Sequence, residues 1–406
     1  MSYKVALIAD NHFMKFGDSV YVNGTYTKQY LRRFTSNFDE LLVIARVKKA
    51  TKDEVQNLRE SGGENVDFCS LPDFYGVRSY LKQKRQLKKL MLEGLEGIDA
   101  IFVRMPCILT TLAFECAKLK KLPIMIDVGA DPDSIYRSAK TTIFELGISK
   151  YMLNVCKKNC MKANGVSYVT RNVLQSKYPC KAIKEGESEE YFTASISNAD
   201  ISRSFYESSR DYLSMSSNEV KLLHISNNIC ANSGKGHTEC IEVLKELVSK
   251  GINATITFVG GGDGIGDIES FAEKYSLKDR VQFTGRIADR EKYKEIIMQH
   301  DIFLFPSHSE GLPRVLLETM ATGMVCVSSN VDGIPEILDE KDIFDYSNSL
   351  EMARRIEELI DSPTLMDQIS VRNLEVSKKY SNESLKIEYD AYYGKVRQLI
   401  DSRKGA

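Results

Sequence analysis

The sequence has no apolar run that approaches the ~20 residues needed to span a bilayer, and Met1 leads directly into a strand-like run instead of a signal peptide. We therefore expect a cytoplasmic protein. An excess of one charge is also missing, because 55 Lys and Arg stand against 56 Asp and Glu, and no nucleic-acid partner is indicated. Within this balance, residues 1–200 carry 30 Lys and Arg against 23 Asp and Glu. A basic first half is typical either of an anionic partner or of scattered, solvated lysines.

A metal-binding pattern is missing as well. The nine cysteines show no repeated spacing, and Cys156 and Cys160, four residues apart, have no histidine near them in the sequence. Reduced thiols explain these cysteines better than a metal site or disulfides do. No Asp-x-Asp pair stands at an expected strand end near residues 305–318. We expect neither a metal nor another cofactor.

The chain of 406 residues is too long for one comfortable hydrophobic core and fits two domains of roughly 150–200 residues each. Short apolar runs rich in strand formers occur at residues 4–9, 41–47, 100–103, 123–126 and 166–170, with helical segments between them. A polar loop with Gly17 and Gly24 follows the first run. This alternation is typical of a parallel sheet that is covered on both faces.

The pattern is lost between about residues 185 and 219, which are rich in Ser, Glu and Tyr, and it restarts at residue 220. Expected strands at 220–225, 255–259, 281–283, 302–305 and 325–328 alternate with expected helices at 236–250, 267–275, 290–298 and 313–322. The sequence predicts an α/β protein with two tandem Rossmann-like, doubly wound domains, at residues 1–200 and 201–382. A C-terminal helix at 383–406 is expected to cross back to the first domain. Such domains bind ligands at the carboxyl ends of their strands, here facing across a cleft.

The most informative stretch leaves the expected strand at 302–305, crosses a small loop and enters the expected helix at 313–322. Pro313 suits the first turn of that helix, where a missing N–H is no loss. The helix N-terminus and the amides of Gly311 and Leu312 then offer a site for an anion such as a diphosphate. Glu310 stands before the helix, and Glu318 lies about six residues into it, ~9 Å along the axis. This separation lets one carboxylate reach a hexose while the other holds the hydroxyls of a ribose.

Glu310 and Glu318 with their surroundings resemble the E-x7-E signature of the family 4 retaining glycosyltransferases, which have the GT-B fold. Pro306-Ser307 precedes the signature, Met-Ala-Thr-Gly follows it at 320–323, and Asp-Gly-Ile-Pro-Glu stands at 332–336 as the family's next loop. The resemblance is dense over residues 220–340 and thin over the first 200. There, residues 168–179 resemble members that assemble bacterial surface polysaccharides. The competing reading is that Glu318 is simply a carboxylate on a helix surface.

The resemblance also implies roles for residues outside the signature. Lys235, before the helix at 236–250, would act as a point charge on the donor's diphosphate. Gly261 lies in a Gly-Gly-Gly turn that lets the backbone approach a ligand, although a plain tight turn explains it nearly as well. The implied catalytic residues are Glu310 and Lys235, and the implied donor-binding residues are Gly24, Gly261, Arg286, Gly311, Leu312, Arg314 and Glu318.

Two stretches depart from the family pattern. The family usually has Gly-Arg about five residues before the lysine, whereas residues 226–230 read Ser-Asn-Asn-Ile-Cys. One phosphate-binding cation is therefore missing, unless Arg314 or another residue replaces it. The usual first-domain histidine is absent from residues 126–131, and His12 is the only histidine of the first domain. These gaps leave room for a relative that has lost catalysis.

A basic amphipathic helix is expected in the first domain. Its cations are Lys82, Lys84, Arg85, Lys88 and Lys89, and leucines occupy its other side. Such a face either docks on an anionic membrane surface, here the inner face of the cytoplasmic membrane, or is merely solvated.

The expected activity is hexose transfer from a nucleotide diphosphate sugar, a UDP-sugar in preference to a GDP-sugar, to a hydroxyl of a glycan or lipid-linked acceptor. The resemblance implies that the anomeric configuration is retained and that the product belongs to bacterial capsule, exopolysaccharide or lipopolysaccharide. Two alternatives stay open: a nucleotide-sugar epimerase of the GT-B fold, and a catalytically weak protein that binds nucleotide sugars.

Overall fold

The computed structural model describes residues 2–405, apart from 134–142, 200, 215–218 and 232. The chain divides into two compact units, residues 1–196 together with 387–406, and residues 197–386. The C-terminal segment thus returns to the unit in which the chain begins. No helix among the described residues is both long and apolar enough to cross a membrane.

Unit 1 is built on a nine-stranded sheet with a parallel core in the order β5-β3-β1-β6-β7-β8-β9. The strands are β1 (Lys4–Phe16), β2 (Ser19–Val22), β3 (Glu40–Lys49), β4 (Arg59–Ser61), β5 (Val66–Leu71), β6 (Ala100–Met105), β7 (Ile124–Val128), β8 (Gly165–Tyr168) and β9 (Phe192–Ser195). Strand β2 pairs antiparallel with both β1 and β4.

The prediction of a polar loop directly after a short first strand is wrong. Strand β1 continues to Phe16 because its register against β3 shifts between Ala9 and His12, which absorbs the polar residues. Beyond the shift, Phe13 is fully buried, and Val20 and Val22 of β2 are buried as well. These short strands form an antiparallel part of the sheet, in which buried and less buried residues alternate. The prediction contained only parallel strands.

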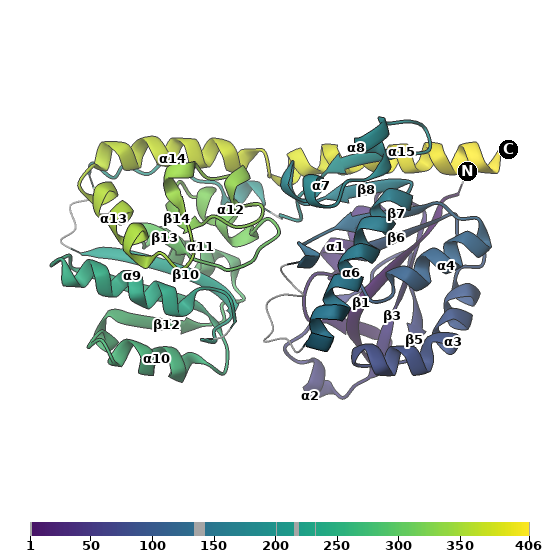
Figure 1. Cartoon of the computed structure of the whole chain (residues 1–406), viewed down its shortest axis with the longest axis horizontal. Helices are drawn as coiled ribbons and strands as arrows, with labels where there is room; N and C mark the ends of the chain where they lie inside the picture. Colours follow the sequence, from purple (N-terminus) through teal and green to yellow (C-terminus); the bar gives the residue numbers. More distant parts are fainter. Residues whose placement is uncertain (1, 134–142, 200, 215–218, 232, 406) are drawn as a thin grey trace. The chain divides into compact units, whose positions relative to one another are not determined.

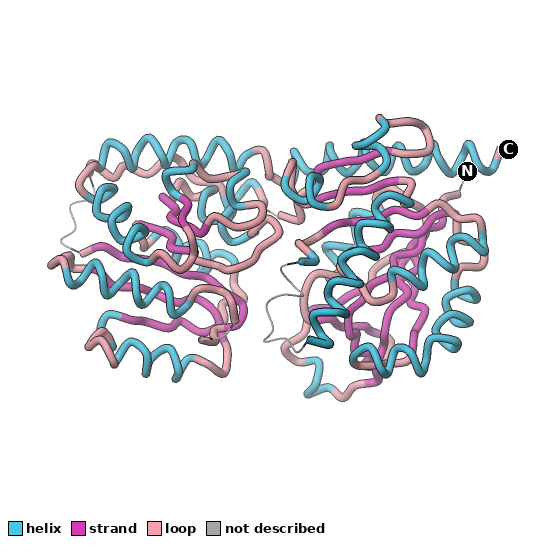
Figure 2. Tube along the Cα trace, in the orientation of Figure 1, coloured by secondary structure: helices cyan, strands magenta, loops and turns pink. Residues whose placement is uncertain are grey.

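Helices cover both faces of this sheet (Figures 1 and 2). They are α1 (Lys28–Thr35), α2 (Lys52–Val55), α3 (Gly76–Gly94), α4 (Thr110–Lys120), α6 (Ile143–Lys162), α7 (Val173–Lys177), α8 (Lys181–Glu185) and α15 (Asn382–Lys404). One core joins α3 and α4 to the strands through Leu87, Met91 and Leu112. A second core joins α1 and α15 to β6, where Phe34 and Tyr393 both contact the ring of Phe102.

Unit 2 has a six-stranded, fully parallel sheet in the order β12-β11-β10-β13-β14-β15. The strands are β10 (Val220–Asn228), β11 (Ala254–Gly261), β12 (Val281–Gly285), β13 (Ile302–Phe305), β14 (Val325–Ser329) and β15 (Ile343–Phe344). The helices are α9 (His237–Ser249), α10 (Ile265–Glu273), α11 (Arg290–Met298), α12 (Arg314–Met320), α13 (Ser349–Ile360) and α14 (Pro363–Lys378). Parallel strands with helices between them confirm the predicted doubly wound architecture.

The irregular stretch before β10 packs on unit 2 through a buried arginine. The Arg210 guanidinium donates to the carbonyl oxygens of Thr322 at 3.1 Å and Ile297 at 3.0 Å, and also to that of His300. A guanidinium presents five donors in a fixed fork, so one side chain can satisfy the last carbonyls of several elements at once. This polar segment does not follow the α/β pattern of the sequence, but it helps to hold unit 2 together.

Candidate active site

The loop between β13 and α12 carries the first glutamate of the predicted signature. Helix α12 begins at Arg314, and Pro313 is its N-cap with extended backbone at ψ 116°. The predicted helix at 313–322 therefore starts one residue too early and ends two residues too late. Glu318 is the fifth helical residue, and Glu310 lies in the loop. The backbone amides of Gly311 and Leu312 donate to no acceptor among the described residues.

Glu310 forms the central contact of this loop. Its Oε1 accepts a hydrogen bond from Lys235 Nζ at 2.6 Å and another from Ser307 Oγ at 2.8 Å. The Glu310 side chain is 14% exposed, and the Lys235 side chain is 37% exposed. The amide of Glu310 also donates to Asp332 Oδ2 at 3.0 Å. The two residues predicted to be catalytic are therefore in direct contact, and both remain reachable from solvent.

Two glycines position Lys235 in the loop between β10 and α9. Gly234 and Gly236 both have positive φ, 67° and 78°, which favours glycine. A Cβ on Gly236 would lie 2.2 Å from the carbonyl oxygen of Pro306. Only a glycine therefore lets this loop approach the loop that carries Glu310.

Glu318 has two partners that the sequence did not reveal. Its carboxylate accepts from Arg290 Nη1 at 3.0 Å and from Tyr293 Oη at 2.8 Å, and it is 13% exposed. Burial raises the pKa of Tyr293 well above its usual range, and Glu318 raises it further. Because Arg290 and Tyr293 are three residues apart, they share one face of α11. Residues three apart share a face in every helix, so this spacing alone did not mark Arg290 and Tyr293 as site residues in the sequence.

The glycines at the end of β11 pack against the end of β10 and the first residue of the loop that follows it. A Cβ on Gly260 would lie 1.8 Å from the carbonyl oxygen of Ser226, and one on Gly262 would lie 2.4 Å from that of Ile229. A Cβ on Gly261 would meet the Arg286 side chain at 2.9 Å. The turn thus brings Gly261 and Arg286 together at the carboxyl end of the sheet.

The structure also locates the remaining predicted residues. Arg314 is exposed at the start of α12, and its charge, like that of Arg290, lowers the pKa of Tyr293. These two arginines are therefore cations beside Glu318, in a chain that lacks the arginine usual before Lys235. Leu312 is buried, and Gly311 accepts a backbone hydrogen bond from Gly333. Gly24 lies in unit 1 between β2 and α1, with φ 119°.

A histidine in the signature loop has partners that sequence reasoning missed. The Nε2 of His308 lies 2.7 Å from Glu239 Oε1, and its ring stacks on Tyr346 with centroids 4.0 Å apart. His308 thereby fixes the loop before Glu310 to α9 and to the segment after β15. No group of three His, Cys, Asp or Glu side chains that could hold a metal ion occurs in the described part of the chain.

Residues 230–375 match the family model "Glycosyl transferases group 1". This part of unit 2 is therefore a glycosyl transferases group 1 domain, and the resemblance that the signature indicated is confirmed. Protein CapJ of Staphylococcus aureus is 25% identical over 394 residues, covering 95% of this chain and 94% of that protein.

One further relative matches part of the chain, and one solved structure matches its fold. The amylovoran biosynthesis glycosyltransferase AmsK of Erwinia amylovora is 33% identical over 111 residues, which cover 26% of this chain and 27% of that protein. The structure of HepE of Anabaena in complex with UDP superposes with a TM-score of 0.67 at 16% identity, covering 98% of this chain and all of that one. The structural likeness confirms the GT-B fold.

Two buried histidines lie beneath the site. His224 of β10 is fully buried and its Nδ1 lies 2.9 Å from the carbonyl oxygen of Leu304, while His237 opens α9 with its Nδ1 3.1 Å from that of Cys230. Burial lowers the pKa of His224 to about 3 and that of His237 to about 4. Both imidazoles are therefore neutral in the folded chain at pH 7.

We predict that these histidines make unit 2 less stable in mild acid. The unfolded chain takes up a proton on each near pH 6.5, whereas the folded chain does not until about pH 3 to 4. Stability is therefore fully present above pH ~6.5 and is lost as the pH falls below it, by about 2 kcal/mol per histidine at about pH 5. Urea unfolding followed by circular dichroism at several pH values measures this loss. The double variant His224→Gln/His237→Gln should lose less stability between pH 7 and 5 than the wild-type protein does. Equal dependence of stability on pH in the variant and the wild type would contradict the assignment.

Proposed function

We propose that the chain is a retaining, metal-independent hexosyltransferase. It moves a hexose from a nucleotide diphosphate sugar, a UDP-sugar in preference to a GDP-sugar, to a hydroxyl of a glycan or lipid-linked acceptor. The observation that carries this proposal is the contact of Lys235 with Glu310, at the carboxyl ends of β10 and β13 in the group 1 domain. The UDP in the HepE structure supports a uridine donor.

The biological setting is bacterial capsule, exopolysaccharide or lipopolysaccharide synthesis. CapJ, which aligns with nearly the whole chain, comes from a bacterium. AmsK is named for the biosynthesis of amylovoran. Both support a role in building a bacterial surface polysaccharide.

The residues of the site suit this reaction. When the bond between the anomeric carbon and the diphosphate oxygen breaks, the leaving oxygen becomes more negative, and Lys235 and the amides of Gly311 and Leu312 stabilise that charge. The acceptor hydroxyl attacks from the same face, its oxygen bonds to the anomeric carbon, and its proton passes to the leaving phosphate. Glu310 stabilises the positive charge that develops on the sugar ring.

Glu318 is suited to a different part of the donor. It sits inside α12 with its carboxylate held by Arg290 and Tyr293, so its orientation is set before a ligand arrives. A carboxylate accepts hydrogen bonds from two vicinal hydroxyls, as a ribose offers. Glu318 therefore contributes to nucleotide binding, with little change between ground state and transition state.

We also propose that α3 attaches the enzyme to an anionic membrane surface. Of its six cations, Lys84 and Lys88 pair with Glu115 at 2.8 and 3.1 Å, and Lys89 lies 3.8 Å from Glu93. Arg78, Lys82 and Arg85 are exposed and make no ion pair among the described residues. These three side chains therefore carry most of the positive charge that a lipid headgroup would meet, and Lys82 and Arg85 belong to the predicted basic face.

The two glutamates should separate in kinetics. Glu310→Gln should lower kcat by about one to three orders of magnitude, since it removes transition-state electrostatics, and should not weaken UDP binding. Glu318→Gln should weaken UDP binding and raise the donor KM more than it lowers kcat. Calorimetry with UDP and steady-state release of UDP from the donor give the two readouts. Glu291→Gln, exposed on α11, is the control and should match wild type. Equal loss of UDP affinity in both site variants would place Glu310 at the nucleotide and contradict its proposed role.

Activity should survive chelation of divalent metal ions. The proposed stabilisation of the leaving diphosphate uses Lys235 and backbone amides rather than a cation held by carboxylates. Release of UDP from the donor sugar, measured in excess EDTA and then with added Mg²⁺ or Mn²⁺, should be the same within twofold. Turnover that disappears in EDTA and returns with the metal would overturn metal independence.

Membrane attachment should depend on the unpaired cations of α3. At ~1 kcal/mol per charge, Lys82→Gln/Arg85→Gln should weaken binding to phosphatidylglycerol vesicles by about 30-fold. The matched variant Lys84→Gln/Lys88→Gln should lose less, because Glu115 already offsets part of that charge. Sedimentation with vesicles at low and high salt measures both. If the two variants and wild type bind alike, α3 is only a solvated face.

A further inference from the structure

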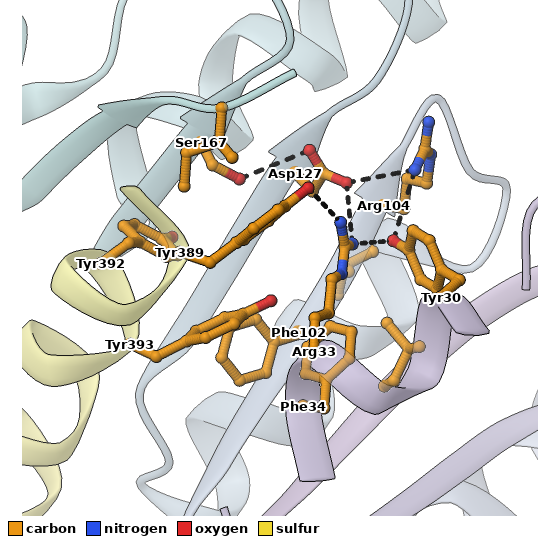
Figure 3. A pocket seen from close by; sticks show the side chains of 13 residues that line it. Tyr30, Arg33, Phe34, Phe102, Arg104, Asp127, Ser167, Tyr389, Tyr392 and Tyr393 are labelled. Atoms are coloured by element: carbon orange, nitrogen blue, oxygen red, sulfur yellow. Dashed lines mark hydrogen bonds and ion pairs between the residues drawn. The ribbon is translucent and has the colours of Figure 1, made fainter. Parts of the chain in front are cut away.

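The pocket in unit 1 that Figure 3 shows is too small to admit a sugar, because it measures about 20 Å³, room for about one water molecule. Arg33 of α1 and Arg104 of β6 both lie beside Asp127 of β7, with nitrogens 3.6 and 3.4 Å from its Oδ2. Arg33 also donates to the Oη of Tyr389 of α15 at 2.7 Å. These contacts hold α1 and α15 on the sheet. A residue that bears on the proposed reaction lies instead in unit 2, beside Glu310.

Asp332, between β14 and the 3₁₀ turn η3 (Ile334–Glu336), has a backbone conformation that favours glycine. Its φ is 45°, in the left-handed region. Gly333 follows with φ −83° and ψ −4°, a conformation that other residues adopt without strain. The sequence therefore places its glycine one position after the point at which the backbone favours one. Residues held in sparsely populated conformations cluster at functional sites, which indicates a use for the side chain at position 332.

The carboxylate of Asp332 holds the peptide group that leads into Glu310. Its Oδ2 accepts a hydrogen bond from the Glu310 amide at 3.0 Å. The carbonyl oxygen of the same peptide, that of Ser309, accepts from Lys235 Nζ at 3.5 Å. Because the N–H and the C=O of a trans peptide point in opposite directions, Asp332 and Lys235 hold this peptide from its two sides. A glycine at position 332 would suit the backbone but would leave the Glu310 amide without this acceptor.

The residue after Asp332 holds the next part of the signature loop. The amide of Gly333 donates to the carbonyl oxygen of Gly311 at 2.9 Å. That carbonyl belongs to the same peptide as the amide of Leu312, so the Leu312 N–H points away from Gly333. Two successive residues of one loop thus set the orientation of Glu310 and of an amide that the proposed reaction uses.

The contact with Asp332 becomes more important when a donor binds. In the structure, Glu310 Oε1 accepts from Lys235 at 2.6 Å and from Ser307 at 2.8 Å. On the proposed function, the donor diphosphate pairs with Lys235, so Glu310 loses one of these two side-chain partners. Its position then depends on Ser307 and on the backbone bond to Asp332.

We propose that Asp332 is a positioning residue for the glycosyl transfer, which acts by holding the backbone of Glu310. The inference rests on the proposed function and adds to it the residue that keeps the Glu310 carboxylate where positive charge develops on the hexose. The required group at position 332 is a hydrogen-bond acceptor rather than a negative charge. The chain keeps a strained aspartate there because glycine, which would relieve the strain, has no acceptor.

Variants of the full chain separate this role from strain and from charge. The assay measures release of UDP, with water as the acceptor, from whichever of UDP-glucose, UDP-galactose and UDP-N-acetylglucosamine the wild type cleaves fastest. Asp332→Gly removes the acceptor and suits the backbone, and kcat should fall by about 10- to 100-fold, the loss of a hydrogen bond to a charged group. Asp332→Asn keeps an acceptor oxygen and should stay within about threefold of wild type.

The matched control is Ser276→Gly, which also places a glycine at a positive φ, 59°, but at an exposed position after α10. Its kcat should equal that of wild type. Calorimetry with UDP reports folding and nucleotide binding, and neither Asp332 variant should bind UDP more weakly than wild type does. A lower kcat with UDP binding intact is a result that general damage to the fold would not give.

A double-mutant cycle tests whether Asp332 acts through Glu310. In the Glu310→Gln background, Asp332→Gly should lower kcat by less than about threefold, because the carboxylate that it positions is already gone. Equal losses in the two backgrounds overturn the positioning role, as do a kcat of Asp332→Gly within twofold of wild type, equal losses in Asp332→Asn and Asp332→Gly, or weaker UDP binding by Asp332→Gly. A wild type that cleaves none of the three donors would instead contradict the proposed function, so the two failures are distinguishable.

Discussion

The ion pair between Lys235 and Glu310 is the interaction on which the arrangement of the site depends. It joins the loop after β10 to the loop after β13, two neighbouring strands of the unit 2 sheet. A lysine and a carboxylate that are both partly solvated gain little stability from pairing alone. Here the pair is supported by Ser307 and by the Gly236 backbone against Pro306, so both loops have one defined position. The positions of Glu310 and Lys235 toward a ligand follow from this contact.

Much of unit 2 could be predicted from the sequence because its signals are local. Buried parallel strands read as short apolar runs, and a glycine-rich turn or a Pro at a helix start marks where each ends. What the sequence could not supply was the partners that pair across the fold. Arg290 and Tyr293 reach Glu318 from another helix, and His308 reaches Glu239, with no spacing that connects them in the chain. Such contacts can be identified only when the order of the strands in the sheet is known.

Unit 1 was harder to predict for a related reason. Strand β1 runs through polar residues at Asn11 and His12 because a register shift absorbs them, and an antiparallel edge follows. Its alternating pattern is too short to distinguish from a loop by periodicity alone. Arg33, Arg104 and Asp127 come from three separate elements, and two of them sit within apolar runs where a charged residue gives no hint of its partners. The pocket between them could be recognised only in three dimensions.

The contact between Lys235 and Glu310 also affects how a donor binds on the proposed function. In unit 2, Lys235 is already neutralised by Glu310, so a diphosphate that binds there must compete with that carboxylate. On the proposed function this competition is useful, because a donor that pairs with Lys235 releases Glu310 toward the sugar ring as the leaving group is secured.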